Sequence, residues 1–129
     1  PQLAARAQAG VGGAVLMARL ALQRGIACNS AGGSHHAGIG YGAGYCVFND
    51  VAVAARVLRA MGLAMKTLVI DLDVQQGDGT AEIFRGDDAV YTFSMHCQDK
   101  FPVRKQAGDR DVGLAAGIGD ETYLEILSG

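Results

Sequence analysis

The stretch TLVIDL, residues 67–72, indicates the fold class of this 129-residue chain. It is a nearly continuous apolar run that ends among carboxylates, and its apolar and polar side chains do not alternate. A strand of this kind is usually buried on both faces, as in a parallel sheet. We therefore expect residues 67–72 to form a central strand, parallel to strands over residues 26–29 and 89–95.

Helical patterns lie on both sides of this strand in the sequence. Residues 2–24 are rich in Ala, Leu and Arg, which favours a helix. Residues 51–61 carry apolar side chains at helical spacing, with Asn49 or Asp50 as the N-terminal cap. Residues 80–84 can add one or two helical turns. The alternation of helices and strands predicts an α/β fold with a parallel sheet in one domain.

The overall composition excludes several classes of protein. Half of the residues are hydrophobic and 19% are charged, which is typical of a globular domain rather than a disordered chain. The formal net charge of -2 argues against a basic surface for nucleic acids. No stretch resembles a membrane span or a leader peptide. We expect a cytoplasmic protein with no nucleic-acid or membrane partner; the composition leaves its oligomeric state open.

The cysteines and the chain ends give two further expectations. The three cysteines are far apart and form no CxxC pair, so we expect neither a disulfide framework nor a cysteine zinc site. The chain begins at Pro1 rather than Met, and it stops soon after an apolar run begins to look helical. We expect it to be a piece of a longer domain.

Polar clusters follow each of the three expected strands, at residues 32–36, 71–79 and 94–96. Ligands of open α/β sheets bind beyond the carboxyl ends of the strands. All three histidines and the densest run of carboxylates would therefore gather at one sheet edge. Each cluster alone is more often a packed histidine, a helix cap or a turn. Together they favour a metal site or an acid–base site.

Four motifs, three of them at these clusters and one between the first two, carry a family resemblance. They read GGSHHA at 32–37, GYCVFND at 44–50, DLDV with GDGT at 71–80, and SMH at 94–96. They resemble the zinc-dependent deacetylases of the histone deacetylase, acetoin-utilisation and acetylpolyamine amidohydrolase group, and FPVRK at 101–105 resembles its bacterial members. The resemblance implies an arginase-like three-layer α/β fold with a central parallel sheet. Residues 1–129 would be the central part of that single domain, without its N- and C-terminal parts.

The resemblance also implies a chemistry for individual residues. The zinc of the family keeps one position open for water, polarises the substrate carbonyl and activates the attacking water. Asp73 matches the first carboxylate ligand. His35 and His36 match tandem catalytic histidines that handle the proton and stabilise the oxyanion, with His36 as the general acid–base. Asp71 would orient His35, and Asp78 would orient His36. The substrate would be an acetylated lysine or an acetylated polyamine.

Two further sets of residues match binding positions of the family. Gly44 and Tyr45 match residues that line the tunnel for the acyl-lysine chain. A second set matches positions around a structural monovalent cation, K⁺, and consists of Asp71, Asp73, Ser94 and Met95.

One ligand position departs from the family pattern. Gln75 stands where the family has a zinc-ligand histidine, and a neutral amide oxygen is a poorer zinc ligand than imidazole. The third ligand and the tyrosine that polarises the carbonyl have no match in this chain. We therefore expect a metal-dependent amide hydrolase by family, but weak zinc binding and no deacetylation by this chain alone. The alternatives are a non-catalytic protein that binds an acylated ligand and, ranked last, a manganese ureohydrolase of the arginase kind.

Overall fold

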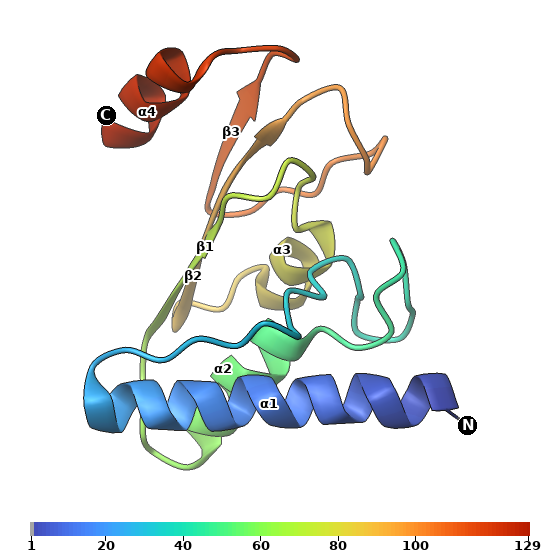
Figure 1. The fold of residues 1–129 in the computed structure, drawn as a ribbon, viewed down its shortest axis with the longest axis vertical. Helices are drawn as coiled ribbons and strands as arrows, with labels where there is room; N and C mark the ends of the chain where they lie inside the picture. Colours follow the sequence, from blue (N-terminus) through green and yellow to red (C-terminus); the bar gives the residue numbers. More distant parts are fainter. Residues whose placement is uncertain (1) are drawn as a thin grey trace.

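A computed structural model describes residues 2–129 (Figure 1). Its helices and strands alternate along the chain in the manner of an α/β fold. In chain order the elements are α1 (Gln2–Arg24), α2 (Asp50–Ala60), β1 (Thr67–Asp71), α3 (Asp78–Phe84), β2 (Val90–Cys97), β3 (Arg110–Leu114) and α4 (Asp120–Ser128). No helix among the described residues combines the length and the apolar character that a membrane span needs.

The three strands form one parallel sheet in the order β1-β2-β3. Asp71 at the end of β1 is in register with Ser94 of β2, and Ser94 is in register with Asp111 of β3. The parallel sheet and the pairing of β1 with β2 confirm the expected fold class. The carboxyl ends of β1 and β2 therefore lie next to each other.

Among residues 2–129 the expected central position of the strand over residues 67–72 is wrong, because β1 lies at the edge of the three-stranded sheet. Residues 26–29, expected to pair with it, form no strand. Leu68 and Ile70 are 59% and 58% exposed, whereas Val69 packs against the core. The reason is that an apolar run indicates burial of the faces of a strand, whereas a central position needs a second strand to pair with it, and residues 26–29 do not supply one. The described residues pack on the face of β1 that carries Val69.

The helices begin and end close to the expected residues. Gly25 follows α1 with a φ of 88°, and its N–H donates to the carbonyl of Ala21 at 2.7 Å. This left-handed conformation is the usual glycine stop of a helix. At the start of α2, Asn49 is the N-cap, since its side chain accepts the N–H of Ala52 at 2.9 Å.

A small apolar core joins α2 and α3 to one face of the sheet. Its fully buried members are Ala52, Ala55, Phe84 and Val90, with Val69 and Ile83 packed against them. The helix α2 packs on α1 on its other side (Figure 1). The loop of residues 25–49 runs from the end of α1 back to the start of α2 and carries the two adjacent histidines toward the sheet.

Candidate functional site

Two adjacent histidines each meet a carboxylate from a different element. Nδ1 of His35 lies 2.6 Å from Oδ2 of Asp71, the last residue of β1. Nδ1 of His36 lies 2.6 Å from Oδ1 of Asp78, the first residue of α3. His36 is only 2% exposed, and the centroids of the two rings are 4.1 Å apart. The structure thus brings together the four residues that the resemblance implies for proton handling.

Two residues at the start of α2 bind the loop that carries His35 and His36 (the histidine loop), both before and after the two histidines. The buried carboxylate of Asp50 accepts the N–H of Gly33 at 3.1 Å and that of Ser34 at 2.7 Å. The side-chain amide of Asn49 donates to the carbonyl of Ala37 at 3.2 Å. From the sequence, Asn49 and Asp50 were predicted as helix caps and as part of the GYCVFND motif, with no role in holding the loop. No local pattern in the sequence indicated that Asp50 binds the loop instead.

The buried Gly77 allows the turn after β1 to pack directly against the pair of His35 and Asp71. A Cβ atom at Gly77 would overlap Oδ2 of Asp71 and would lie 3.2 Å from Nδ1 of His35. The other oxygen of Asp71 accepts the N–H of Asp73 at 3.0 Å. Both carboxylate oxygens of Asp71 are therefore engaged, which fixes the acceptor that His35 faces.

The environment of His35 favours its protonated form. Burial lowers the pKa of His35, but the hydrogen bond to Asp71 and the negative charges of Asp71, Asp73 and Asp78 outweigh burial and raise this pKa above its ordinary value. A histidine that keeps its proton can donate to a negatively charged oxygen beside it. This property suits the stabilisation of an oxyanion.

Gln75 engages the second nitrogen of His36. Its Oε1 lies 3.0 Å from Nε2 of His36, while its own main-chain N–H donates to Oδ1 of Asp73 at 2.8 Å. If Nε2 of His36 carries a proton, it donates to the amide oxygen of Gln75. If Nε2 is unprotonated, the Gln75 amide can rotate by half a turn so that its NH2 group donates to Nε2. In either state the side chain of Gln75 is directed to His36.

The donor set of these residues does not fit a catalytic zinc ion. Such an ion takes three protein ligands, drawn from Cys, His and carboxylates. Asp73 offers one exposed carboxylate, and Gln75 offers a neutral amide that is already bonded to His36. Within residues 2–129 there is no group of three or more His, Cys, Asp or Glu side chains able to hold a metal. What the described residues do provide is two carboxylate–imidazole pairs.

Phe101, which the sequence placed only in the FPVRK motif and not among the predicted site residues, forms a wall beside His36. The two rings meet edge to face, with centroids 4.8 Å apart and planes at 87°. The backbone of Gly44 lies close against the imidazole ring of His36, since a Cβ atom at Gly44 would overlap that ring. The neighbouring Tyr45 has a positive φ of 63°, and its side chain is fully exposed. Of the two expected tunnel residues, Gly44 contacts the histidine and Tyr45 extends into solvent.

The third histidine does not join the pair. His96 lies within β2, is 2% exposed, and shares a 2.9 Å hydrogen bond with Ser94. Burial lowers its pKa below the ordinary value, despite the opposing charge of Asp111. His96 thus lies at the carboxyl end of β2, at the expected edge of the sheet, but its hydrogen bond is to Ser94 and not to the carboxylates that hold His35 and His36. The expected K⁺ site of Asp71, Asp73, Ser94 and Met95 stays a prediction.

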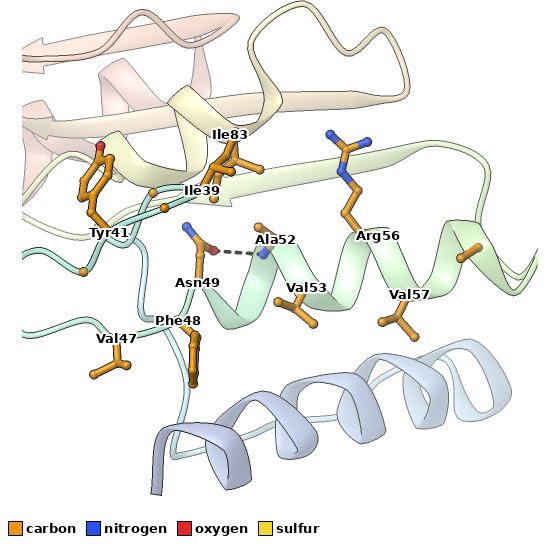
Figure 2. Close-up of a pocket in the computed structure, with 14 residues that line it drawn as sticks. Ile39, Tyr41, Val47, Phe48, Asn49, Ala52, Val53, Arg56, Val57 and Ile83 are labelled. Atoms are coloured by element: carbon orange, nitrogen blue, oxygen red, sulfur yellow. Dashed lines mark hydrogen bonds between the residues drawn. The ribbon is translucent and has the colours of Figure 1, made fainter. Parts of the chain in front are cut away.

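A large apolar cleft lies away from the histidine pair. It has a volume of about 790 Å³ and lies between the loop of residues 38–42 and α2 (Figure 2). Its lining is mostly apolar, and Arg56 on its border is paired with Asp87 at 2.5 Å. None of the predicted site residues lines it. The candidate site is therefore the histidine pair, not this cleft.

Comparisons with known proteins agree with the four motifs. The histone deacetylase domain family matches residues 1–128. An uncharacterized protein of Picosynechococcus sp. is 56% identical over 118 residues, which is 92% of this chain and 39% of the relative. The acetoin utilization protein AcuC of Staphylococcus aureus is 40% identical over 93 residues, 70% of this chain and 24% of the relative.

A solved structure shares the fold. The crystal structure of a histone deacetylase homologue from Aquifex aeolicus superposes with a TM-score of 0.79 at 30% identity, over 92% of this chain and 35% of the homologue. The chain thus spans less than half the length of each of these relatives.

Proposed function

Because this chain belongs to the histone deacetylase domain family, we propose that its site serves the hydrolysis of an acetylated amine, an acetyl-lysine or an acetylated polyamine. The observation that carries the proposal is the pair of carboxylate-bound histidines, His35 with Asp71 and His36 with Asp78. Amide hydrolysis needs one group that moves a proton from water to the leaving nitrogen and another that stabilises the oxyanion.

The two histidines divide these tasks by their surroundings. The pKa of His35 is raised, so His35 is the better donor to a developing oxyanion. His36 carries its Nδ1 against Asp78, which leaves Nε2 as the atom that exchanges a proton with the reacting groups. Phe101 and Gly44 stand beside His36, where an apolar wall and a bare backbone suit the aliphatic stem of an acylated amine. Tyr45 joins them if its exposed ring folds over a bound stem.

The family activates water with a zinc ion, and this chain offers too few suitable ligands to bind one tightly. Asp73 is one normal ligand, and Gln75 replaces the second. No step is therefore assigned to a metal here. The bond between Gln75 and Nε2 of His36 favours a second candidate function, the non-catalytic binding of an acylated amine, because it occupies the nitrogen that would move the proton.

The deciding experiment changes Gln75→His and measures zinc affinity and turnover separately. Zinc is titrated into this chain and its Gln75→His form, and both are assayed with an acetyl-lysine peptide. The same pair is then compared in the intact protein that contains residues 1–129. Gln98→His, at an exposed glutamine, is the matched control. We expect tighter zinc binding in the Gln75→His chain without turnover, and turnover in the Gln75→His form of the intact protein.

Two results would change this conclusion. Tight stoichiometric zinc together with turnover in the unaltered chain contradicts the assessment of Gln75. An intact protein that stays inactive with His at position 75, yet binds the acetylated peptide, favours the non-catalytic function.

A further inference from the structure

Gln76, the neighbour of Gln75, is one of the most deeply buried polar side chains of the protein. It is 1% exposed, and its amide makes three hydrogen bonds. Nε2 donates to the main-chain carbonyl of Gln106 and to Oδ1 of Asp111, both at 2.8 Å. Oε1 accepts the main-chain N–H of Gln106 at 2.9 Å. One side chain thus pairs with both main-chain groups of one residue, as a neighbouring strand would.

The segment that Gln76 holds is the connection between β2 and β3, which carries Phe101. Within it, the ammonium group of Lys105 donates to the carbonyls of Lys100 and Pro102, at 2.6 and 2.7 Å. Gln76 fixes the main chain at Gln106, which is bonded to Lys105. The side chain of Lys105 in turn binds Lys100 and Pro102, the residues on either side of Phe101. The far end of the connection is tied separately, where Asp109 accepts the N–H of Thr92 at 2.8 Å.

We propose that Gln76 is a positioning residue that holds Phe101 against His36 and so sets one wall of the pocket for the acylated amine. The identity of the ligand rests on the proposed function. The positioning does not rest on it, because it follows from contacts between residues of this chain. Gln75 and Gln76 then have separate tasks: Gln75 faces His36 directly, and Gln76 acts on the same histidine indirectly, through the loop that carries Phe101.

The chain offers a matched control for this role. The side chain of Gln106 points outward, where its Oε1 accepts from Arg85 at 2.5 Å, and only its main-chain groups bind Gln76. Gln106→Ala therefore removes the exposed contact and leaves the buried one. Gln76→Leu keeps a side chain of similar size and removes all three buried hydrogen bonds.

The first readout is structural and uses nuclear magnetic resonance on the full chain. In Gln76→Leu we expect the N–H of Gln106 to exchange with solvent about tenfold faster or more, because its acceptor is gone. We also expect the Overhauser contacts between the rings of Phe101 and His36 to disappear. Gln106→Ala should change neither. Lys105→Met should abolish the ring contacts without speeding the exchange of the Gln106 N–H. Lys105 is only partly buried, so this substitution tests the link even if Gln76→Leu does not fold.

The second readout is binding of an N-acetyl-lysine peptide, followed by the same resonances. We expect Gln76→Leu and Lys105→Met to bind it about five- to tenfold more weakly than the unaltered chain, with Gln106→Ala unchanged. Ring contacts that persist in a folded Gln76→Leu form, or in Lys105→Met, overturn the proposal, as does unweakened binding once the contacts are lost. If the unaltered chain binds no acetylated peptide, the proposed function fails, and the ring contacts still decide whether Gln76 positions Phe101.

Discussion

Nδ1 of His35 lies 2.6 Å from Oδ2 of Asp71, and this contact joins the loop before α2 to the end of the edge strand β1. The contact is only partly exposed, with side-chain exposures of 12% and 15%. It therefore has two consequences at once. It stabilises the position of the loop, and it couples that stability to the protonation of His35.

The first prediction concerns the pH dependence of this pair. The pKa of His35 in the folded chain is raised above its ordinary value of 6.5. The stabilisation that it contributes is therefore complete below pH 6.5 and is lost as the pH rises through the folded pKa. In Asp71→Asn the hydrogen bond to a carboxylate and the nearest negative charge are gone, so the pKa should fall. A titration of the imidazole resonances measures both forms.

His96 provides an internal comparison in the same titration. Burial lowers its pKa, so its midpoint should lie below 6.5, on the opposite side from that of His35. Its effect on stability has the opposite sign, because the unfolded chain takes up the proton first and the fold loses stability as the pH falls. An unchanged midpoint for His35 in Asp71→Asn would contradict the assignment of Asp71 as the cause.

The second prediction is that Asp50→Ala loosens the histidine loop. It removes the acceptor of two main-chain N–H groups, those of Gly33 and Ser34. The two hydrogen bonds are only partly buried, so water can replace part of what the carboxylate provides. A hydrogen bond to a charged group contributes about 1.5–3 kcal/mol, and we expect the free energy of unfolding to fall by an amount near the lower end of this range. Urea denaturation gives this value, and faster hydrogen exchange at Gly33 and Ser34 shows where the loss occurs. Asp88→Ala, at an exposed aspartate, should leave both quantities unchanged.

The third prediction compares two glycines. Gly77→Ala would place a methyl group on Oδ2 of Asp71, so the turn after β1 must move away from His35. We expect it to destabilise the fold and to abolish the raised pKa of His35. Gly12→Ala, in the middle of α1 with nothing within 4 Å of the added atom, should instead stabilise the fold by about 0.5–1 kcal/mol. Equal effects of the two changes would refute the close approach at Gly77.

The sequence predicted those parts of the fold that depend on local periodicity. The bounds of α1 and the cap of α2 follow from apolar spacing and from single residues such as Asn49. The pairing of β1 with β2 follows from the apolar run at residues 67–72. The position of β1 at the edge of the three described strands did not follow, because it depends on whether a distant segment pairs with β1, and no local pattern records that.

The candidate site was predictable only in part, for a similar reason. The partners of His35 and His36 were named by the family resemblance, since no spacing within residues 32–36 points to Asp71 or Asp78. Phe101 was missed because the hydrogen bonds that bring it to His36 run through the main chain of Gln106. A buried glutamine with both ends of its amide satisfied has no signature in sequence, since exposed glutamines have the same letter.

The last prediction separates stability from function at Tyr45. This residue has a φ of 63°, a conformation that strains any side chain with a Cβ atom, and its ring is fully exposed and so contributes no burial to the fold. Tyr45→Gly relieves the strain of about 1–2 kcal/mol and adds some freedom to the unfolded chain, so we expect a net gain of roughly 0.5–1 kcal/mol. Tyr45→Ala keeps the strain and should leave stability nearly unchanged.

Both changes remove the ring, so both should weaken binding of an N-acetyl-lysine peptide to a similar extent if the ring closes over the substrate stem. Thermal unfolding and peptide titration of the three forms give the two quantities separately. Equal stability of the Gly and Ala forms would show that no strain is stored at this position, and undiminished binding in both would remove Tyr45 from the pocket.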